Sequence, residues 1–350
     1  MTATDPGIAR WRLHTQQVAR PAYDDPAEVV RRMGAVQSQD YVASRWAVGL
    51  RTRGATESTV ERALADRAIV RTHFMRNTVH LVAPEDLRWM LRLVAPRIRM
   101  IIDSIGRAAR LDLDENVYAR SNEVIGDALA GGRQLTRPEL GERLEAAGIP
   151  TAGRLTLLTQ RAQTDGIVCH AARYGLALTD EWLPPGRDLR GEEALAELAR
   201  RYFRGHGPAT VRDFAWWCGL TLTDCRRAAA AVAPELERVA IRGEVYLAAG
   251  PPPAANPAEA LTHLLGNYDE YTVGYKDRSA VFDAAHRAKV DTPGHNILFT
   301  HTIVVDGEIL GTWKRRGAAV TATLFRPVTP AQEAAVEAAA SRYRAFLEAG

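Results

Sequence analysis

The fold is decided by LTRPELGERLEAAGI, at Leu135–Ile149, and by a second stretch of the same pattern, ATVRDFAWWCGLTLT, at Ala209–Thr223. Each stretch opens with a threonine that can cap a short helix. A turn and a second helix are expected next, over residues 153–164 in the first copy and 221–232 in the second. Two short β-prone runs then follow in each copy. Helix, turn, helix, hairpin is the order of a winged helix, so at least two such repeats are predicted.

The N-terminal region is predicted to be a third, divergent copy. Helices are expected over residues 25–33, 40–48 and 57–65. A hairpin follows, with its turn at Arg76-Asn77 and strands over residues 69–73 and 78–82.

The pattern changes after the proline-rich segment 251–257, which predicts a linker. Residues 297–305 and 308–314 alternate in polarity around Asp306-Gly307, which predicts a hairpin. A third strand and an alanine-rich helix complete the chain. The fold class is therefore predicted as α+β, mainly α, with tandem winged helices and a C-terminal β-hairpin domain. The predicted domains are winged helices at 1–95, 96–187 and 188–250, and the hairpin domain with its terminal helix at 251–350.

Composition is ordinary for a soluble globular protein, with 350 residues, 46% hydrophobic and 25% charged. No apolar run approaches the roughly 18 residues that span a bilayer, and no signal peptide is recognisable, so we expect a cytoplasmic, nucleoid-associated protein. The cysteines are Cys169, Cys218 and Cys225. Their odd number and the lack of a Cys-x-x-Cys pair argue against disulfides and against a zinc site.

The formal net charge is only +3, so any positive surface for nucleic acid must come from local clusters of basic residues. Lys314-Arg315-Arg316 form one basic cluster and residues 88–110 hold another. Each cluster is equally consistent with an ordinary solvated face. All basic residues except Lys276, Lys289 and Lys314 are arginine, so an amine nucleophile is scarce.

Four segments carry a resemblance to a known family. They are MGAVQSQDYVASRWAVGLRT at Met33–Thr52, RTHFMRNTVHLVAPEDLRWML at Arg71–Leu91, RYFRGHGPATVRDFAWWCGL at Arg201–Leu220 and NYDEYTVGYKDRS at Asn267–Ser279. Together they resemble the AlkZ-like DNA glycosylases, winged-helix proteins that remove bulky alkylated bases from DNA. The resemblance covers most of the chain. It implies a C-shaped protein with a concave DNA-binding surface that uses no metal, flavin or nicotinamide.

Gln37 and Gln39 are the candidate catalytic residues. Two residues apart, they point to the same side of an extended segment, whereas a helix would separate them by about 200°. Spacing alone also allows two polar loop residues. The resemblance implies a Gln-x-Gln motif that faces DNA and positions the hydrolytic water. Ser38 stands where the family more usually has an apolar residue.

Further residues could contact DNA. On the first hairpin these are His73, Arg76 and His80, although a strand histidine is more often packed or hydrogen-bonded. The resemblance places the C-terminal hairpin against DNA, which adds Lys314, Arg315 and Arg316. Asp40 could be an adjacent carboxylate, although the cap of the next helix suits it better. Asp269 and Glu270 could form a carboxylate pair, although neighbouring residues on a strand diverge in direction. Trp216-Trp217 are most simply a core pair.

The leading hypothesis is a monofunctional DNA glycosylase that excises N7-alkylated purines, acting as a monomer on double-stranded DNA in repair or self-resistance. Bulky adducts and interstrand crosslinks from genotoxic natural products are the candidate lesions. A cationic base leaves without a general acid, so oriented water and amide oxygens suffice. The alternative is a non-enzymatic winged-helix transcription regulator, expected to be a dimer. A small-molecule hydrolase would need a closed pocket.

Overall fold

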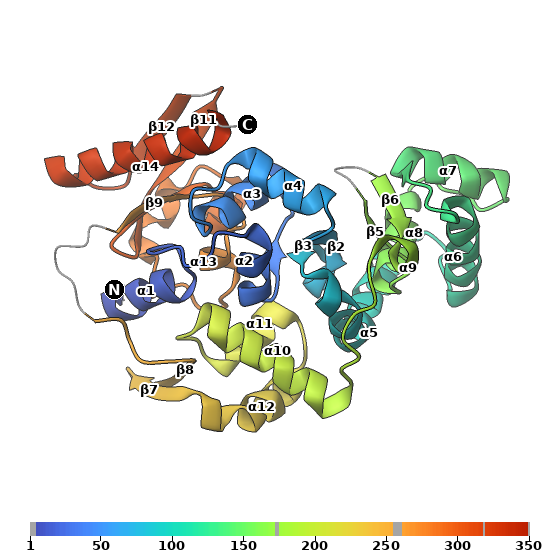
Figure 1. The fold of residues 1–350 in the computed structure, drawn as a ribbon, viewed down its shortest axis with the longest axis horizontal. Helices are drawn as coiled ribbons and strands as arrows, with labels where there is room; N and C mark the ends of the chain where they lie inside the picture. Colours follow the sequence, from blue (N-terminus) through green and yellow to red (C-terminus); the bar gives the residue numbers. More distant parts are fainter. Residues whose placement is uncertain (1–4, 172–174, 255–260, 318, 349–350) are drawn as a thin grey trace.

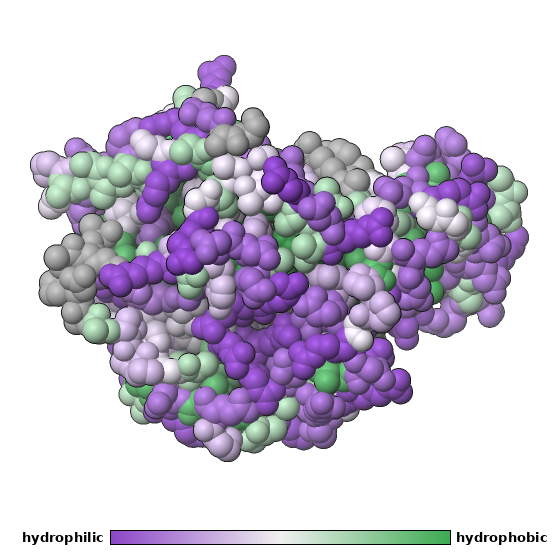
Figure 2. Space-filling model, viewed as in Figure 1, coloured by the Kyte–Doolittle hydropathy of each residue, from purple (hydrophilic) through white to green (hydrophobic). Residues whose placement is uncertain are grey.

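The computed structural model describes residues 5–171, 175–254, 261–317 and 319–348 (Figure 1). The fold is α+β. Within the described residues, the strands form antiparallel sheets of six, four and two strands. The face in Figure 2 is mostly hydrophilic, with hydrophobic side chains in scattered patches.

The N-terminal elements follow the predicted order, because their boundaries are set by local caps. Asp25 accepts from the backbone N–H of Ala27 at the start of one helix, and Thr56 forms a capping box at the start of another. The elements are α1 (Pro6–Thr15), α2 (Pro26–Met33), β1 (Val36–Gln37), α3 (Tyr41–Leu50), α4 (Glu57–Ala65), β2 (Val70–Phe74), the turn η1 (Met75–Asn77) and β3 (Thr78–Val82).

Both predicted repeats have the helix, turn, helix, hairpin order. Thr136 and Thr210 form the capping boxes that the sequence predicts. The first repeat comprises β4 (Leu135–Thr136), α7 (Arg137–Ala146), α8 (Leu155–Thr164), β5 (Val168–His170) and β6 (Gly175–Leu178), preceded by α6 (Glu115–Leu129) and followed by α9 (Thr179–Trp182). The second comprises α11 (Val211–Cys218), α12 (Leu222–Ala231), η2 (Ala233–Glu235), β7 (Glu237–Ile241) and β8 (Glu244–Ala248), preceded by α10 (Gly191–His206).

The predicted boundary between residues 95 and 96 does not separate two units. It falls inside α5 (Pro84–Ala108), a continuous helix of 25 residues. The six-stranded sheet also crosses this boundary, in the order β1-β3-β2-β5-β6-β4, where Arg71 pairs with His170. The first two hairpins therefore belong to one sheet.

Two hydrophobic cores organise the described residues. One core joins the two repeats through α5 and α10, with Trp89, Tyr118 and Phe203 fully buried. The other joins the first 81 residues to the C-terminal segment and includes Trp46 and Phe346. The C-terminal segment is thus packed on the N-terminal elements (Figure 1).

The C-terminal segment contains a four-stranded sheet in the order β12-β11-β10-β9 and a long terminal helix. The predicted strand over residues 297–305 is too long, since its first part is a helical turn. The elements are β9 (Thr262–Leu265), α13 (Glu270–Val273), η3 (Ala284–Lys289), η4 (Pro293–His295), η5 (Ile297–Phe299), β10 (Thr302–Val305), β11 (Glu308–Arg316), β12 (Ala319–Leu324) and α14 (Pro330–Glu348). Asn256-Pro257 of the predicted linker lie outside the described residues.

The turn at Asp306-Gly307 packs against α1. A Cβ on Gly307 would lie 2.6 Å from the Cβ of Ala9, and Arg10 pairs with Asp306 at 2.8 Å. Lys314, Arg315 and Arg316 lie at the other end of β11, beside the turn into β12. The basic cluster therefore belongs to the β11–β12 hairpin, and the expectation that it flanks the Asp306-Gly307 turn is wrong.

Candidate active site

Gln37 and Gln39 lie on and just after the edge strand β1. Gln37 is opposite His80 in the antiparallel pairing with β3, and the N–H of Ser38 donates to the carbonyl of Val79 at 2.7 Å. The segment is therefore extended as far as Ser38, as predicted. Gln37 is buried, with 6% of its surface exposed, whereas Gln39 is exposed. The side-chain oxygen of Gln39 accepts from the N–H of Val79 at 3.3 Å.

Ser38 is fully buried between the two glutamines. Its hydroxyl contacts that of Ser44 at 2.8 Å and accepts from Arg71 at 3.1 Å. A serine thus suits this position, where the family more usually has an apolar residue, because α3 and β2 supply its hydrogen-bond partners.

Arg76 holds the side-chain amide of Gln37. Its Nη2 donates to Oε1 of Gln37 at 3.2 Å from the tight turn between β2 and β3, where Arg76 adopts a left-handed φ of 58°. Burial lowers the pKa of this guanidinium, which nevertheless stays protonated at neutral pH. The structure thus brings together two residues that the sequence suggested for separate roles, Arg76 for DNA contact and Gln37 for catalysis.

Glu270 lies beneath Gln37 and is fully buried. Its Oε1 accepts from the backbone N–H of Gln37 at 2.7 Å. Its Oε2 contacts Nε2 of His206 at 3.0 Å and accepts from Nε1 of Trp217 at 3.2 Å. Burial alone raises the pKa of this carboxyl, but the hydrogen bond and charge of His206 outweigh it, so the pKa lies below its ordinary value. Glu270 is therefore a buried carboxylate directly behind the candidate amide.

Asp269 points away from Glu270, as the adjacency of the two residues predicts. It accepts two hydrogen bonds from Arg51, at 2.9 and 2.7 Å, and both side chains are fully buried. It also caps α13. Asp269 and Glu270 therefore do not form a carboxylate pair, and the role of Asp269 is structural.

His73 and His80 are buried rather than displayed on the hairpin surface. Burial lowers the pKa of His73 to about 3 and that of His80 to about 4, so both imidazoles are neutral at pH 7. The backbone N–H of His73 donates to the side-chain oxygen of Gln163, and His80 stacks edge-on against Phe74. Both rings are buried within the protein, and their contact with DNA stays a prediction.

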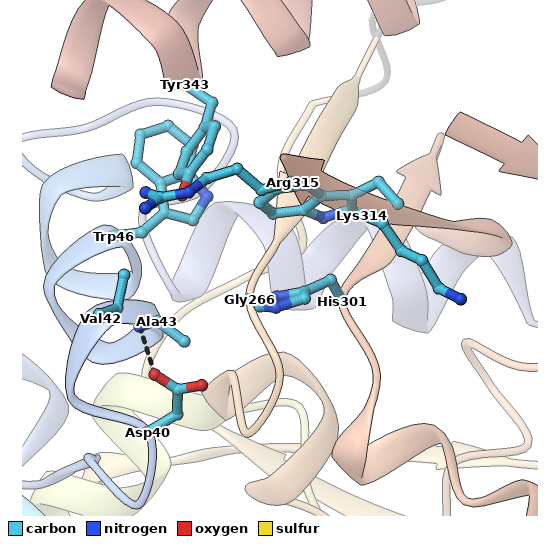
Figure 3. A pocket seen from close by; sticks show the side chains of 10 residues that line it. Asp40, Val42, Ala43, Trp46, Gly266, His301, Lys314, Arg315 and Tyr343 are labelled. Carbon is cyan, nitrogen blue, oxygen red and sulfur yellow. Dashed lines mark hydrogen bonds between the residues drawn. The ribbon is translucent and has the colours of Figure 1, made fainter. Parts of the chain in front are cut away.

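A cavity of about 390 Å³ opens beside Asp40, between the start of α3 and β11 (Figure 3). Asp40 caps α3 by accepting from the N–H of Ala43 at 3.0 Å, as predicted. Aromatic side chains form one wall of this cavity, and the exposed Lys314 and Arg315 lie at its rim. The aromatic residues are Trp46, His301, Trp313 and Tyr343.

The basic residues at the rim differ in their partners. Lys314 donates to Asp291 at 2.8 Å, and Arg315 donates to the hydroxyl of Tyr343 at 3.3 Å. Arg316 is exposed and forms no ion pair with any described carboxylate. Lys314 and Arg315 therefore bring positive charge to the cavity, whereas Arg316 does not line it.

Among the residues that the structure covers, no cluster of three or more His, Cys, Asp or Glu side chains could hold a metal ion. No described helix is long and apolar enough to cross a bilayer.

The chain belongs to the DNA glycosylase AlkZ-like family, whose model matches residues 30–346. It is similar to the interstrand DNA cross-link repair glycosylase of Streptomyces sahachiroi, with 26% identity over 334 residues, covering 88% of this chain and 86% of that protein. The solved structure of Streptomyces sahachiroi DNA glycosylase AlkZ has a similar fold, with a TM-score of 0.80 and 24% identity, covering 99% of this chain and 97% of that one.

The contacts that assemble the site could not be predicted from the sequence. Glu270 is 233 residues from Gln37, and no local pattern links them. The acidic pair in NYDEY was a signal that a carboxylate mattered, but its partner could not be read from spacing.

Proposed function

We propose that this protein is a monofunctional DNA glycosylase that excises N7-alkylated purines from double-stranded DNA, as a monomer, in repair or self-resistance. The observation that carries the proposal is that Arg76 holds the side-chain amide of Gln37 while Glu270 holds its backbone N–H. The relative named as an interstrand cross-link repair glycosylase supports bulky adducts and crosslinks as lesions. In this proposal the helix-turn-helix repeats act as winged helices, and they line a concave DNA-binding surface with the β11–β12 hairpin.

The site needs no general acid, because a purine alkylated at N7 is already cationic and leaves without protonation. The protein must orient a water molecule and stabilise an oxocarbenium-like sugar. The side-chain oxygens of Gln37 and Gln39 can accept from that water, and their partial negative charge faces the developing cation.

Glu270 acts through Gln37 in this mechanism. Its two oxygens are occupied by three described donors, and it is fully buried, so it is not a general base for the water. It fixes the position of the Gln37 backbone, and its negative charge adds to the potential at the sugar.

Strand cleavage is not expected, because the imine chemistry of a lyase requires an amine nucleophile. Arginine stays protonated and cannot supply one. Of the lysines, Lys289 donates to the carbonyl of Phe325, Lys314 pairs with Asp291, and Lys276 is exposed.

The test is incubation of the protein with duplex DNA that carries one N7-alkylguanine, followed by mild alkali. We expect an intact strand with an abasic site, cut only after alkali, and no protein–DNA adduct on treatment with borohydride. A regulator would bind the same duplex and release no base. Cleavage before alkali, or a trapped adduct, would replace water attack with lyase chemistry.

A further inference from the structure

Trp216 is partly exposed beside the candidate active site. The sequence suggests that Trp216 and Trp217 are a core pair, but only Trp217 is fully buried, and 37% of the surface of Trp216 is exposed. The indole N–H of Trp216 donates to the carbonyl of Val273 at 3.0 Å, which fixes the ring next to α13. The ring is therefore fixed in place with part of its surface open to solvent.

Two guanidinium groups share the Trp216 ring. The Cζ of Arg76 lies 5.5 Å from the ring centroid and that of Arg278 lies 5.4 Å from it, both within cation–π range. Backbone carbonyls of Thr272 and Lys276 accept from Arg278 at 2.8 and 3.2 Å. Arg278 is thus anchored by neutral groups, and so its positive charge is not cancelled.

Neither cation has a carboxylate in direct contact, although the charge of Glu270 acts on Arg76 and the charges of Asp213 and Asp277 act on Arg278. Neither Arg76 nor Arg278 forms an ion pair with a described carboxylate, whereas the buried Arg51 is paired with Asp269. Nε of Arg76 and Nη2 of Arg278 are buried and have no hydrogen-bond partner among the described residues. Burial, followed by the charge of Arg76, lowers the pKa of Arg278 to about 10. Partly buried like charges that lack a direct ion pair favour the binding of an anion between or beside them.

We propose that Arg76, Arg278 and the exposed face of Trp216 bind a backbone phosphate of the lesion-bearing strand, next to the target nucleotide. The planar guanidinium fork matches phosphate oxygens, and each arginine has a nitrogen left to donate. Arg76 also donates to Gln37, so one side chain connects the bound phosphate to the amide. This inference rests on the proposed function, since it requires DNA as the substrate.

The test combines Arg278→Gln with duplexes in which single phosphates around the lesion are replaced by uncharged methylphosphonates. Arg190→Gln is the matched control, because Arg190 is exposed and paired with Asp188. For the wild-type protein, one replacement next to the lesion should weaken binding by about tenfold, as expected for loss of a charged hydrogen bond. Arg278→Gln should weaken binding to unmodified DNA by a similar factor. The methylphosphonate next to the lesion should then reduce the affinity of this variant little further. Its slope of log K against log salt should be shallower by about 0.9.

Two results would overturn the phosphate site. One is that Arg278→Gln and the uncharged linkage reduce DNA affinity independently of each other. The other is that no linkage replacement reduces the affinity of the wild-type protein. Specific competition by inorganic phosphate at matched ionic strength would instead assign the pair to a free anion. The scan on wild-type protein remains decisive if Arg278→Gln does not fold, as judged by thermal unfolding. Base release by the wild-type protein tests the proposed function separately, because release with no linkage dependence contradicts only the phosphate site.

Discussion

Gln37 is oriented by residues that lie far from it in the sequence. Arg76, 39 residues away, holds its amide, and Glu270, 233 residues away, holds its backbone N–H. In the proposed mechanism, the amide would need little reorganisation to face a reacting sugar, which is the property that makes preorganised dipoles effective in catalysis.

Glu270→Gln tests this positioning role. The amide nitrogen of glutamine cannot accept the hydrogen bonds that Glu270 now accepts, so the Gln37 backbone should shift. We expect base release to slow by on the order of 10²-fold, the typical effect of a small misplacement of a catalytic group. DNA affinity should be unchanged, because the site is buried beneath the surface.

Trp217→Phe is the control for that variant. It removes one donor to Glu270 but leaves the contact with Gln37, so it should cost stability and little activity. Both rates are measured well below the unfolding temperature of each variant. Equal losses of rate in the two variants would reduce Glu270 to a purely structural residue.

At the residue scale, the sequence predicts what is local. The cap at Asp40 and the diverging carboxylates at Asp269 and Glu270 follow from neighbouring residues and are confirmed. The burial of His80 and the exposure of Trp216 depend on tertiary packing, because a strand or helix pattern does not reveal which elements will cover it.

At the element scale, caps and turn residues predict most boundaries. The predicted helix over residues 57–65 agrees with α4, whose capping box begins at Thr56. The strand predicted from residue 297 is wrong because Asn296 bonds the N–H of Leu298 and starts a helical turn. Gly307 packs against α1, which is far away in the sequence. The sequence of the hairpin alone therefore could not show that its turn at Asp306-Gly307 is packed against the protein.

The β11–β12 hairpin is expected to contact DNA through its basic strand. Reversing Lys314, Arg315 and Arg316 to glutamate should weaken binding and make the salt slope shallower by about 0.9 for each phosphate that the hairpin no longer neutralises. Affinity is measured over a series of salt concentrations.

Arg326→Glu is the control for the hairpin, because Arg326 pairs with Glu308 near the opposite end of β11. Its salt slope should match that of the wild-type protein. If the triple reversal also keeps the wild-type slope, the hairpin is not part of the DNA interface.

At the scale of the whole molecule, the described residues pack around two hydrophobic cores, whereas the sequence suggests four domains. Proline-rich segments and repeats locate elements along the chain, but they do not show that the C-terminal segment returns to pack on α3. Gly49 permits this packing, since a Cβ there would collide with the ring of Phe346. The return is what brings α13 and Glu270 to β1.

Buried neutral histidines should make the folded protein sensitive to mild acid. Burial lowers the pKa of His80 to about 4 and the pKa values of His73, His170 and His263 to about 3. Below pH 6.5 the unfolded chain therefore binds more protons than the folded one, and stability falls as pH falls toward these values. Each histidine contributes a slope of about 1.4 kcal/mol per pH unit at most.

Denaturant unfolding at pH 7, 6 and 5 measures this dependence. His263→Leu should flatten it by one proton, because neither ring nitrogen of His263 has a described hydrogen-bond partner to lose. A free energy of unfolding that is constant from pH 7 to 5 would show that these histidines are protonated in the folded state as readily as in the unfolded one.

The most direct test of the central claim is the rate of base release from an N7-alkylguanine duplex by the Gln37→Ala, Gln39→Ala double variant, with DNA affinity measured in parallel. Removing an oriented polar group that stabilises the transition state typically costs on the order of 10²-fold or more in rate. Two neutral amides contribute little to phosphate-driven binding, so affinity should stay near that of the wild-type protein. We expect release to be abolished while binding persists, and release at the wild-type rate would contradict the catalytic role of the two glutamines.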